Sequence, residues 1–509
     1  MSVITALPLK RVTEIRVDRS NEDCLTFEPV EKMVRGSAKH LLIEISAAHT
    51  HTEPQCCEVI LNGDRGAAYN VREFSGSGSN VATHAGLSRR FADGVDIPPQ
   101  NRSRYGGGYL FFPNAFGEDN LKIFQAMGSS FEERLQRHVG LHDSTSIISS
   151  ISLRPRQAGS SPNFWSVGSI MTLYAVDEDF LITRKTLAGS RDPSFRELPS
   201  ETNHLAFVMH ARALDGREGD QGARIYQAVN GSGTHNDFPM QRFGGENNKI
   251  NKVLDGRFEE PRVGWSPNDF APANSFGSLV AFYPEFQRSS FCQCWISQHA
   301  AWEETFFPVS QENGAWIHRQ EVMEFQFYSQ FRGGYASGSY IDAYRLPVSH
   351  SSRRIAGASG ESSVTLEVPE HASCMRAFVV ARTNANVEID GLLIGFNGNL
   401  EGSNYVRRRM SAAKSSHETH VAAESDFGVL PGSNAPPEVF GCNVIAFPHH
   451  AAVDREKHVL SVGGTSTGML ALFGGRWNCT EAVTSVTFTP KIGTKFAEGS
   501  TFELSFAGT

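Results

Sequence analysis

Two histidines and two cysteines lie close together near the start of the chain. In "AAHTHTEPQCCEV", His49 and His51 precede the adjacent thiols of Cys56 and Cys57. Imidazole and thiolate are donors that zinc prefers in proteins, so this stretch is a candidate metal site. On a strand, however, His49 and His51 share one face, whereas Cys56 and Cys57 point in opposite directions. The competing interpretation is a strand with buried thiols and no metal, and we expect no cofactor.

Three further motifs are candidates for chemistry, and each has a simpler structural interpretation. "FCQCW" places Cys292 and Cys294 on one strand face, but it lacks the two-residue spacer of a redox dithiol. "GTSTG" at 464–468 fits Gly-x-Ser-x-Gly, yet its surroundings predict two strands about a loop instead of a strand–turn–helix elbow. The two histidines of "PHH" follow an apolar strand and are expected on an exposed loop. Because no paired-carboxylate cleft is marked either, we expect a protein that is not an enzyme.

Four aromatic residues on expected loops are candidates for stacking against sugar rings. They are Tyr105 and Tyr109 in "RSRYGGGYLFF", Trp265 in "RVGWSPNDF", and Trp302 in "AAWEETFF". Such faces would suit a host-surface polysaccharide, with nearby Asn, Asp and Arg side chains binding its hydroxyls. The alternative is that these aromatics belong to the core or to contacts between molecules.

The elements that would position these residues occur three times, once about every 165 residues. Each copy ends on a strand that follows a Gly-Ser pair, and an aromatic residue stands three positions before the glycine. Glycine gives such a turn its conformational freedom, and serine can bind the local backbone. The three sets are Trp165 with Gly168-Ser169, Tyr335 with Gly338-Ser339, and Phe496 with Gly499-Ser500.

A second repeated signal lies upstream in each copy, where an apolar strand runs into an Asn-Gly pair. Asn-Gly is a strong turn signal because both residues tolerate positive φ. The pairs are Asn62-Gly63, Asn230-Gly231 and Asn397-Gly398. Trp316 and Trp477 precede the next-to-last strand of the second and third copies, and His142 takes that place in the first.

The short alternating runs, the turn residues and the scarcity of helical periodicity predict an all-β protein. We expect three tandem antiparallel β-sandwiches of jelly-roll type, in which the opening and closing strands of each unit pair. Residues 129–141, "SSFEERLQRHVGL", are the best helix candidate. Three sandwiches in one chain would make a long, stiff scaffold. The expected segments are an N-terminal arm at 1–30, which would dock on a neighbour, sandwiches at 31–180, 203–347 and 364–509, and linkers at 181–202 and 348–363.

Composition narrows the function classes. The chain has 509 residues, of which 40% are hydrophobic and 20% charged, and its net charge is −8. An acidic chain of this kind is not expected to bind nucleic acid, and no apolar run approaches the length of a membrane-spanning helix. The start shows no signal-peptide core, so synthesis in a cytoplasm is expected. The eight scattered cysteines fit reduced, buried thiols better than a disulfide framework.

The repeated features together resemble the β-sandwich repeats of bacteriophage virion structural proteins. The resemblance rests on the strand that ends in Asn-Gly with a Tyr soon after, on the Trp before the penultimate strand, and on the closing Gly-Ser-x-x-x-Leu-Tyr strand. It covers nearly the whole chain in three copies, of which "VGSIMTLYAV" keeps the closing strand best. It implies a structural part of the virion, assembled in the cytoplasm of a bacterial host.

The resemblance leaves the position on the particle open. A homo-oligomeric component of the tail or other host-facing apparatus, in contact with other virion proteins, is the first expectation. A capsid decoration or head-fibre protein, and an adhesin for a host-surface glycan, are the alternatives.

Overall fold

The computed structural model is built almost entirely from antiparallel strands, arranged as three pairs of sheets. It describes residues 3–507 except 20, 35–37, 78–79, 101–102, 131–133, 158–161, 197, 201, 217–221, 234–239, 247–248, 254–260, 290–291, 302–308, 319, 331–332, 347–350, 371, 414–415 and 467. Among these residues, no helix has the length and hydropathy that crossing a membrane would require.

Each pair of sheets consists of one 8-stranded and one 4-stranded sheet. In the first unit the large sheet is, in spatial order, β1 (Leu9–Arg16), β12 (Ile170–Val176), β3 (Leu41–Ala47), β8 (Gly106–Phe112), β9 (Lys122–Ser129), β10 (Arg134–His142), β5 (Tyr69–Ser77) and β6 (Asn80–Arg89). The small sheet is β2 (Leu25–Phe27), β11 (Ile151–Pro155), β4 (Gln55–Leu61) and β7 (Ala92–Ile97). The short helices η1 (Val3–Ala6) and α1 (Val30–Met33) accompany this unit.

The second and third units repeat this order strand for strand. The second has the large sheet β13 (Leu181–Thr186), β24 (Tyr340–Arg345), β15 (His204–Ala211), β20 (Gly277–Pro284), β21 (Gln293–Ala300), β22 (Val309–Trp316), β17 (Met240–Glu246), β18 (Lys249–Val253) and the small sheet β14 (Ser194–Phe195), β23 (Phe325–Ser329), β16 (Ala223–Val229), β19 (Arg262–Ser266). The third has the large sheet β25 (Ser351–Ile355), β36 (Thr501–Ala507), β27 (Ser373–Ala381), β32 (Gly441–Phe447), β33 (Lys457–Gly464), β34 (Met469–Trp477), β29 (Tyr405–Ala413), β30 (Ser416–Ala422) and the small sheet β26 (Val364–Glu367), β35 (Ser485–Pro490), β28 (Ile389–Phe396), β31 (Asp426–Pro431). The turns η2 (Glu178–Phe180) and η4 (Gly402–Asn404) complete the described elements.

The sheet order confirms the all-β sandwich fold and the pairing of opening with closing strands, since β3, β15 and β27 pair with β12, β24 and β36. It corrects the expected arm and linkers. Segments 1–30, 181–202 and 348–363 contain β1, β13 and β25, which form the outer edge of each large sheet, so each unit begins with strands of its own. The helix expected at 129–141 is also wrong. Most of that stretch is β10, and its apolar residues Leu135, Val139 and Leu141 are spaced by even numbers of residues, so they share the strand face that is buried in the axial core.

The Asn-Gly pairs form the turns that the sequence predicts. The three asparagines have φ between 50° and 53° and the glycines that follow have φ between 69° and 77°. Each asparagine side chain also ties the turn to the start of the penultimate strand of its unit. Asn397, for example, accepts hydrogen bonds from the backbone of Thr484 and Ser485 and donates one to the carbonyl of Ala482. Asn62 and Asn230 make the equivalent contacts in their own units.

The Gly-Ser pairs fix the edge of each sandwich. Gly168, Gly338 and Gly499 have φ between 82° and 89°, a conformation that favours glycine. Each following serine hydroxyl bonds both backbone groups of one residue just after the opening strand: Ser169 binds Ala48, Ser339 binds Arg212 and Ser500 binds Arg382. The aromatic residues before these pairs, Trp165, Tyr335 and Phe496, are fully buried plugs.

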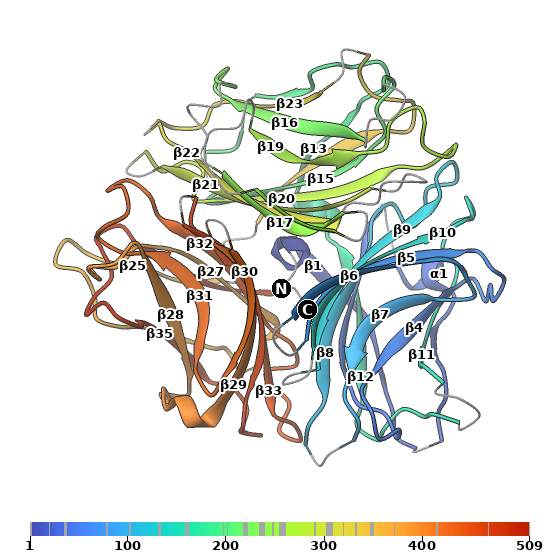
Figure 1. Cartoon of the computed structure of the whole chain (residues 1–509), viewed down its shortest axis with the longest axis horizontal. Helices are drawn as coiled ribbons and strands as arrows, with labels where there is room; N and C mark the ends of the chain where they lie inside the picture. Colours follow the sequence, from blue (N-terminus) through green and yellow to red (C-terminus); the bar gives the residue numbers. More distant parts are fainter. Residues whose placement is uncertain are drawn as a thin grey trace.

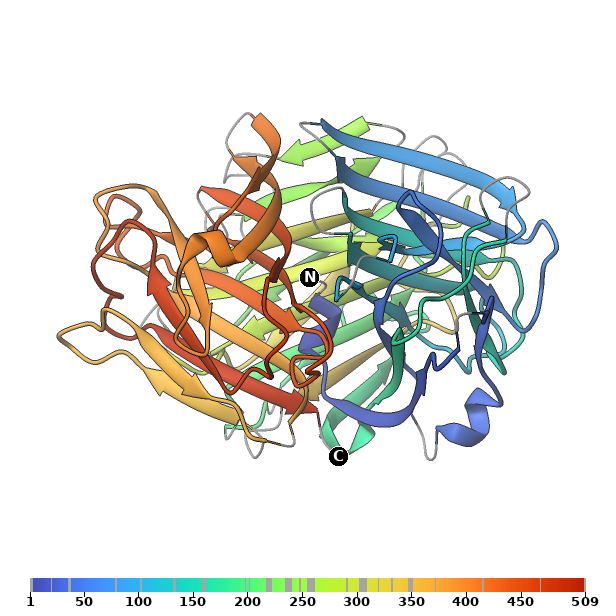
Figure 2. The same cartoon turned by 90° about the horizontal axis from the view of Figure 1, so that it is seen from below.

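The three units surround a common axis instead of forming a row (Figure 1). Their large sheets face inward, and Figure 2 shows the same closed arrangement from the side. On β8, Leu110 and Phe112 belong to the first sandwich core, whereas Tyr109 and Phe111 belong to a second core on the axis. The large sheets are therefore buried on both faces, and we call this axial core the hub.

The hub is filled by the N-terminal segment Val3–Leu7, which lies beside the axis in Figure 1. The backbone N–H of Val3 donates to Gln298 Oε1 at 3.1 Å. Arg376 Nη1 donates to the carbonyls of Thr5, at 2.7 Å, and Leu7. The segment thus docks within its own chain, on side chains of the second and third units.

Candidate functional site

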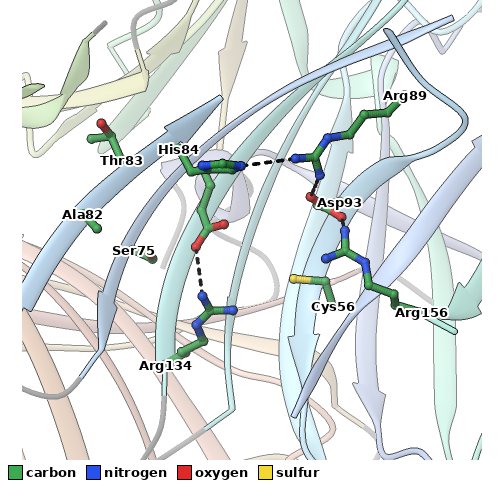
Figure 3. Close-up of a pocket in the computed structure, with 10 residues that line it drawn as sticks. Cys56, Ser75, Ala82, Thr83, His84, Arg89, Asp93, Arg134 and Arg156 are labelled. Carbon is green, nitrogen blue, oxygen red and sulfur yellow. Dashed lines mark hydrogen bonds and ion pairs between the residues drawn. The ribbon is translucent and has the colours of Figure 1, made fainter. Parts of the chain in front are cut away.

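A charged pocket opens in the first unit, between its two sheets (Figure 3). Its volume is about 410 Å³. The large sheet supplies Glu73 from β5, His84 and Arg89 from β6, and Arg134 from β10. The small-sheet side supplies Asp93 from β7 and Arg156 from just beyond β11. The site depends on the sandwich, because these six side chains come from strands that are distant in the sequence.

Ion pairs hold the arginines in place around the pocket. Arg89 and Arg156 both contact the carboxylate of Asp93, and the first of these contacts is 2.8 Å long. Arg89 also lies 3.2 Å from His84 Nε2. Arg134 lies 3.7 Å from Glu73 and 3.9 Å from Asp96, which is longer than a hydrogen bond. Figure 3 shows Arg89 and Arg156 converging on Asp93, with Arg134 apart from them.

Shifted pKa values occur at Glu73 and Cys56, which line the pocket, and at Asp96, which is buried against Cys56. Burial raises the pKa of Asp96 to about 6, although Arg134 and the Cys56 thiol act in the opposite direction. Burial also raises the pKa of Cys56 well above its ordinary value, which keeps this thiol protonated and unreactive. Burial would raise the pKa of Glu73 too, but His138, Ser75 and Arg134 outweigh it and lower that pKa, so Glu73 is ionised.

The expected metal residues do not come together. Cys56 lines the pocket and donates to Asp96 at 3.1 Å, whereas Cys57 points into the sandwich core, as strand alternation requires. His49 is buried, with Nε2 on the Ile97 carbonyl and Nδ1 accepting from the backbone of His51. These two contacts occupy both ring nitrogens of His49, so the four residues form no metal site here.

The aromatic residues expected to stack on sugars are buried where they are described. Tyr105 donates to the Val167 carbonyl and lies under Arg455, and Tyr109 is in the hub. Trp265 is 5% exposed and is surrounded by the guanidinium groups of Arg224, Arg242 and Arg262. Trp302 lies outside the described residues. Tyr109 belongs to β8 and Trp265 to β19, and both side chains are buried.

The other chemical motifs are structural. Cys292 and Cys294 are buried free thiols, and Cys294 contacts Cys442 of the third unit. The "GTSTG" sequence forms the β33–β34 hairpin, in which Thr465 Oγ1 accepts from the backbone of Gly468. The "PHH" histidines are not on an exposed loop: both are buried, at the contact between the third and first units.

Sequence reasoning missed the polar clusters at the contacts between units, which we call seams. In the first seam, His40 Nε2 lies 3.0 Å from Asp342, which also pairs with Arg184. In the second seam, His204 Nε2 lies 3.0 Å from Glu503, near Arg353. Asn114 and Glu285 donate their backbone N–H groups to Nδ1 of His40 and His204, so each imidazole carries a link from one unit to the next.

The third seam has a different composition. Cys374 replaces the histidine, and the backbone N–H of His449 donates directly to Glu44 of the first unit at 3.1 Å. Burial raises the pKa of Glu44 to about 7, although the His449 backbone and the Cys374 thiol act in the opposite direction. Burial raises the pKa of Cys374 well above its ordinary value, so this thiol is not a nucleophile.

Among the described residues, one group of side chains has metal-ligand spacing: His204, Glu285 and Glu503 in the second seam. Arg353 lies 2.6 Å from Glu285 and 3.6 Å from Glu503. The guanidinium group therefore supplies the positive charge that a metal ion would bring, as Arg184 does in the first seam. The cluster is an ion-pair network that joins two units.

Comparison with known proteins identifies no family. No family model matches the chain, and no curated protein matches it. Among solved structures, domains LG4-5 of the mouse laminin alpha1 chain are 9% identical, cover 64% of this chain and 89% of that chain, and have a TM-score of 0.12. A mutant of the GH43 protein BlXynB from Bacillus licheniformis is 7% identical, covers 89% of this chain and 100% of that chain, and has a TM-score of 0.18. Scores this low carry no argument about function.

Proposed function

We propose that the chain is a non-enzymatic structural protein of a bacteriophage particle, placed in the tail or other host-facing apparatus. The virion context comes from the resemblance of the three repeats to virion β-sandwich proteins. The observation that supports a structural role is the closed ring of three units around a filled hub. One chain thereby provides the threefold arrangement that virion parts otherwise obtain from three copies.

The seams support a role in which the ring must stay rigid. Each seam is buried and polar, and each links a backbone group of one unit to a carboxylate of the next, through an imidazole in two seams and directly in the third. Such contacts impose one relative orientation, because a shifted seam would leave buried charges without partners. A rigid ring suits a structural component that connects neighbouring virion proteins and further copies of the chain.

A capsid decoration protein is the second candidate, and the pseudo-threefold ring favours it specifically. A single copy would match a local threefold position of a capsid lattice without forming a homotrimer. In both candidates the protein is found on the virion, after assembly in the host cytoplasm, and it inserts into no membrane.

Cryo-electron microscopy of the purified particle, with the copy number from quantitative mass spectrometry, tests the proposal. We expect three, six or twelve copies around the tail axis. Copies spread over the capsid lattice would replace the tail assignment with decoration. Absence of the chain from purified particles would refute the virion role.

A further inference from the structure

The charged pocket occupies one end of the interior of the first sandwich. Along β5, Tyr69 and Val71 face inward and belong to the apolar core. The next two inward positions on the same strand, Glu73 and Ser75, line the pocket instead. The space between the sheets therefore changes from packed and apolar to hollow and charged within one strand.

Different residues occupy the same location in the other two units. Cys56 pairs in register with Asp96 in the first unit, and the equivalent pairs are Arg224 with Trp265 and Gly391 with Val429. In the second unit the buried Trp265 indole lies where Asp96 would be, between three guanidinium groups. In the third unit the buried Val429 takes this place.

The fold therefore does not require a carboxyl group at the Asp96 position. The Asn-Gly and Gly-Ser contacts recur in all three units, and the Asp93–Arg156 ion pair has a counterpart in Asp426–Lys491 of the third unit, but Asp96 has no such counterpart. Burying Asp96 is costly, and an apolar residue at the same position serves the third unit. A costly polar group that the fold can omit is typical of a functional site.

One side of the pocket is suited to a carboxylate. Arg89 and Arg156 share the single carboxylate of Asp93, which leaves a net positive charge on that side. Both guanidinium groups are fixed by this contact, so a ligand would meet donors that are already oriented. Both also remain partly exposed, at 28% and 31% of their side-chain surface, so they can be reached from solvent.

The other side is suited to hydroxyl groups. Ionised Glu73 can only accept hydrogen bonds, and it lies beside Ser75. An inorganic anion lacks the carbon-bound hydroxyl groups of a sugar, and its charge would be repelled by Glu73. Among the described residues that line the pocket there is no Phe, Tyr or Trp, which disfavours a neutral sugar held by stacking.

We propose that this pocket binds a sugar acid, a monosaccharide unit whose carboxylate pairs with Arg89 and Arg156 and whose hydroxyls bond Glu73 and Ser75. The volume of about 410 Å³ lies in the range of small-ligand sites and holds one such unit at the end of a glycan. The inference deepens the host-facing role proposed above and rests on it for its biological meaning. An acidic host-surface glycan would be the natural source of such a unit.

Binding is tested with the purified full chain by saturation-transfer NMR and titration calorimetry. The probes are glucuronic acid, N-acetylneuraminic acid, glucose and inorganic phosphate. We expect at least one of the two sugar acids to bind with a Kd of about 1 mM, the range open to a monosaccharide-sized ligand. Glucose and phosphate should bind at least tenfold more weakly.

Three variants locate the site. Arg89→Met should weaken sugar-acid binding at least tenfold, because it removes one guanidinium group from the carboxylate side. Ala82→Trp fills the pocket from its exposed rim without breaking an ion pair and should abolish binding. Arg90→Met is the matched control, since Arg90 is the exposed neighbour of Arg89 and does not line the pocket, and it should bind like the parent chain.

The results that would contradict the proposal refute different parts of it. No binding of either sugar acid, or equal binding by Ala82→Trp, would refute the site. Phosphate that binds as tightly as the sugar acids would refute the hydroxyl side of the proposal. None of these results changes where the chain lies on a particle, so a failure here is separable from a failure of the virion role.

Discussion

Glu44 should make the stability of the protein fall as the pH rises from about 4.5 to about 7. Its carboxyl group is buried in the third seam, where burial raises its pKa from the ordinary 4.5 to about 7. In that interval the unfolded chain has lost the Glu44 proton and the folded chain still holds it. The folded state therefore binds more protons, and its free energy of unfolding decreases as the pH increases.

The size of the effect follows from the two pKa values. A difference from 4.5 to about 7 corresponds to about 3 kcal/mol, at about 1.4 kcal/mol for each pH unit. The contribution is complete below about pH 4.5, where both states are protonated, and is lost by about pH 8. His204 adds a loss in the same direction, because Glu503 raises its pKa against the effect of burial. A single variant is therefore needed to isolate Glu44.

Glu44→Gln removes the titration and keeps a carbonyl that can accept from the His449 backbone. Urea unfolding of the parent and variant chains at pH 5, 6, 7 and 8 gives the difference in stability at each pH. We expect the variant to gain about 2.5 kcal/mol relative to the parent between pH 5 and pH 8, because part of the effect is already lost at pH 5. Glu53→Gln, at an exposed carboxylate of the same unit, should give no such trend. Parallel pH curves for Glu44→Gln and the parent would refute the argument that burial keeps Glu44 protonated.

Three further predictions test the turns, the first seam and the ring. Asn397→Gly keeps the positive φ but loses the side-chain hydrogen bonds, so thermal and urea unfolding should show a loss of about 2–3 kcal/mol, with Asn397→Asp partly restored through its remaining acceptor. Asp342→Asn should cost about 2 kcal/mol at pH 7, because it removes the buried carboxylate that His40 and Arg184 share and leaves Arg184 with Glu178 alone; an unchanged midpoint would show that the first seam is not stabilising. Bonds from His40 and Arg184 outweigh burial and hold the pKa of Asp342 below 3.8, so the deficit should shrink as the pH falls below that value. The isolated chain should be a monomer of 55.9 kDa in light scattering, since the ring is closed within one chain, and a mass three times larger would contradict this.

The sequence predicts the units of this fold well because their turn residues act locally. The turns at Asn397 and Gly499 depend on the positive φ of these residues and on contacts with one other segment of the same unit. The residue types and their spacing therefore indicate the turns without a structure. The ring is different, because it depends on which faces of the large sheets are apolar. The continuous apolar run of "YLFFP" is the available signal, since a strand buried on both faces has no polar alternation. Nothing in the sequence indicates which unit that second face meets.

The candidate site could be predicted only in fragments. The sequence marks Cys56 as a candidate metal ligand because histidines lie near it. Its partners in the structure are instead Asp96 and Gln136, which come from other strands. Arg89 and Arg156 are ordinary surface residues in the sequence; Arg89 reaches Asp93 across the short β6–β7 connection, whereas Arg156 reaches it only through the fold. Tyr109 and Trp265 are expected on loops because glycine and proline lie near them, although they belong to β8 and β19.

The N-terminal segment in the hub imposes an order on biosynthesis. Val3–Leu7 leave the ribosome long before Gln298 and Arg376, the side chains that hold them, have been translated. The segment must therefore wait while the first and second sandwiches fold, with its apolar residues uncovered. A chain that stops before the third unit has no Arg376 to bind the Thr5 and Leu7 carbonyls and keeps that segment exposed. Completion of the ring is thus coupled to completion of translation, and an interrupted chain carries an uncovered apolar segment that proteases and chaperones can recognise.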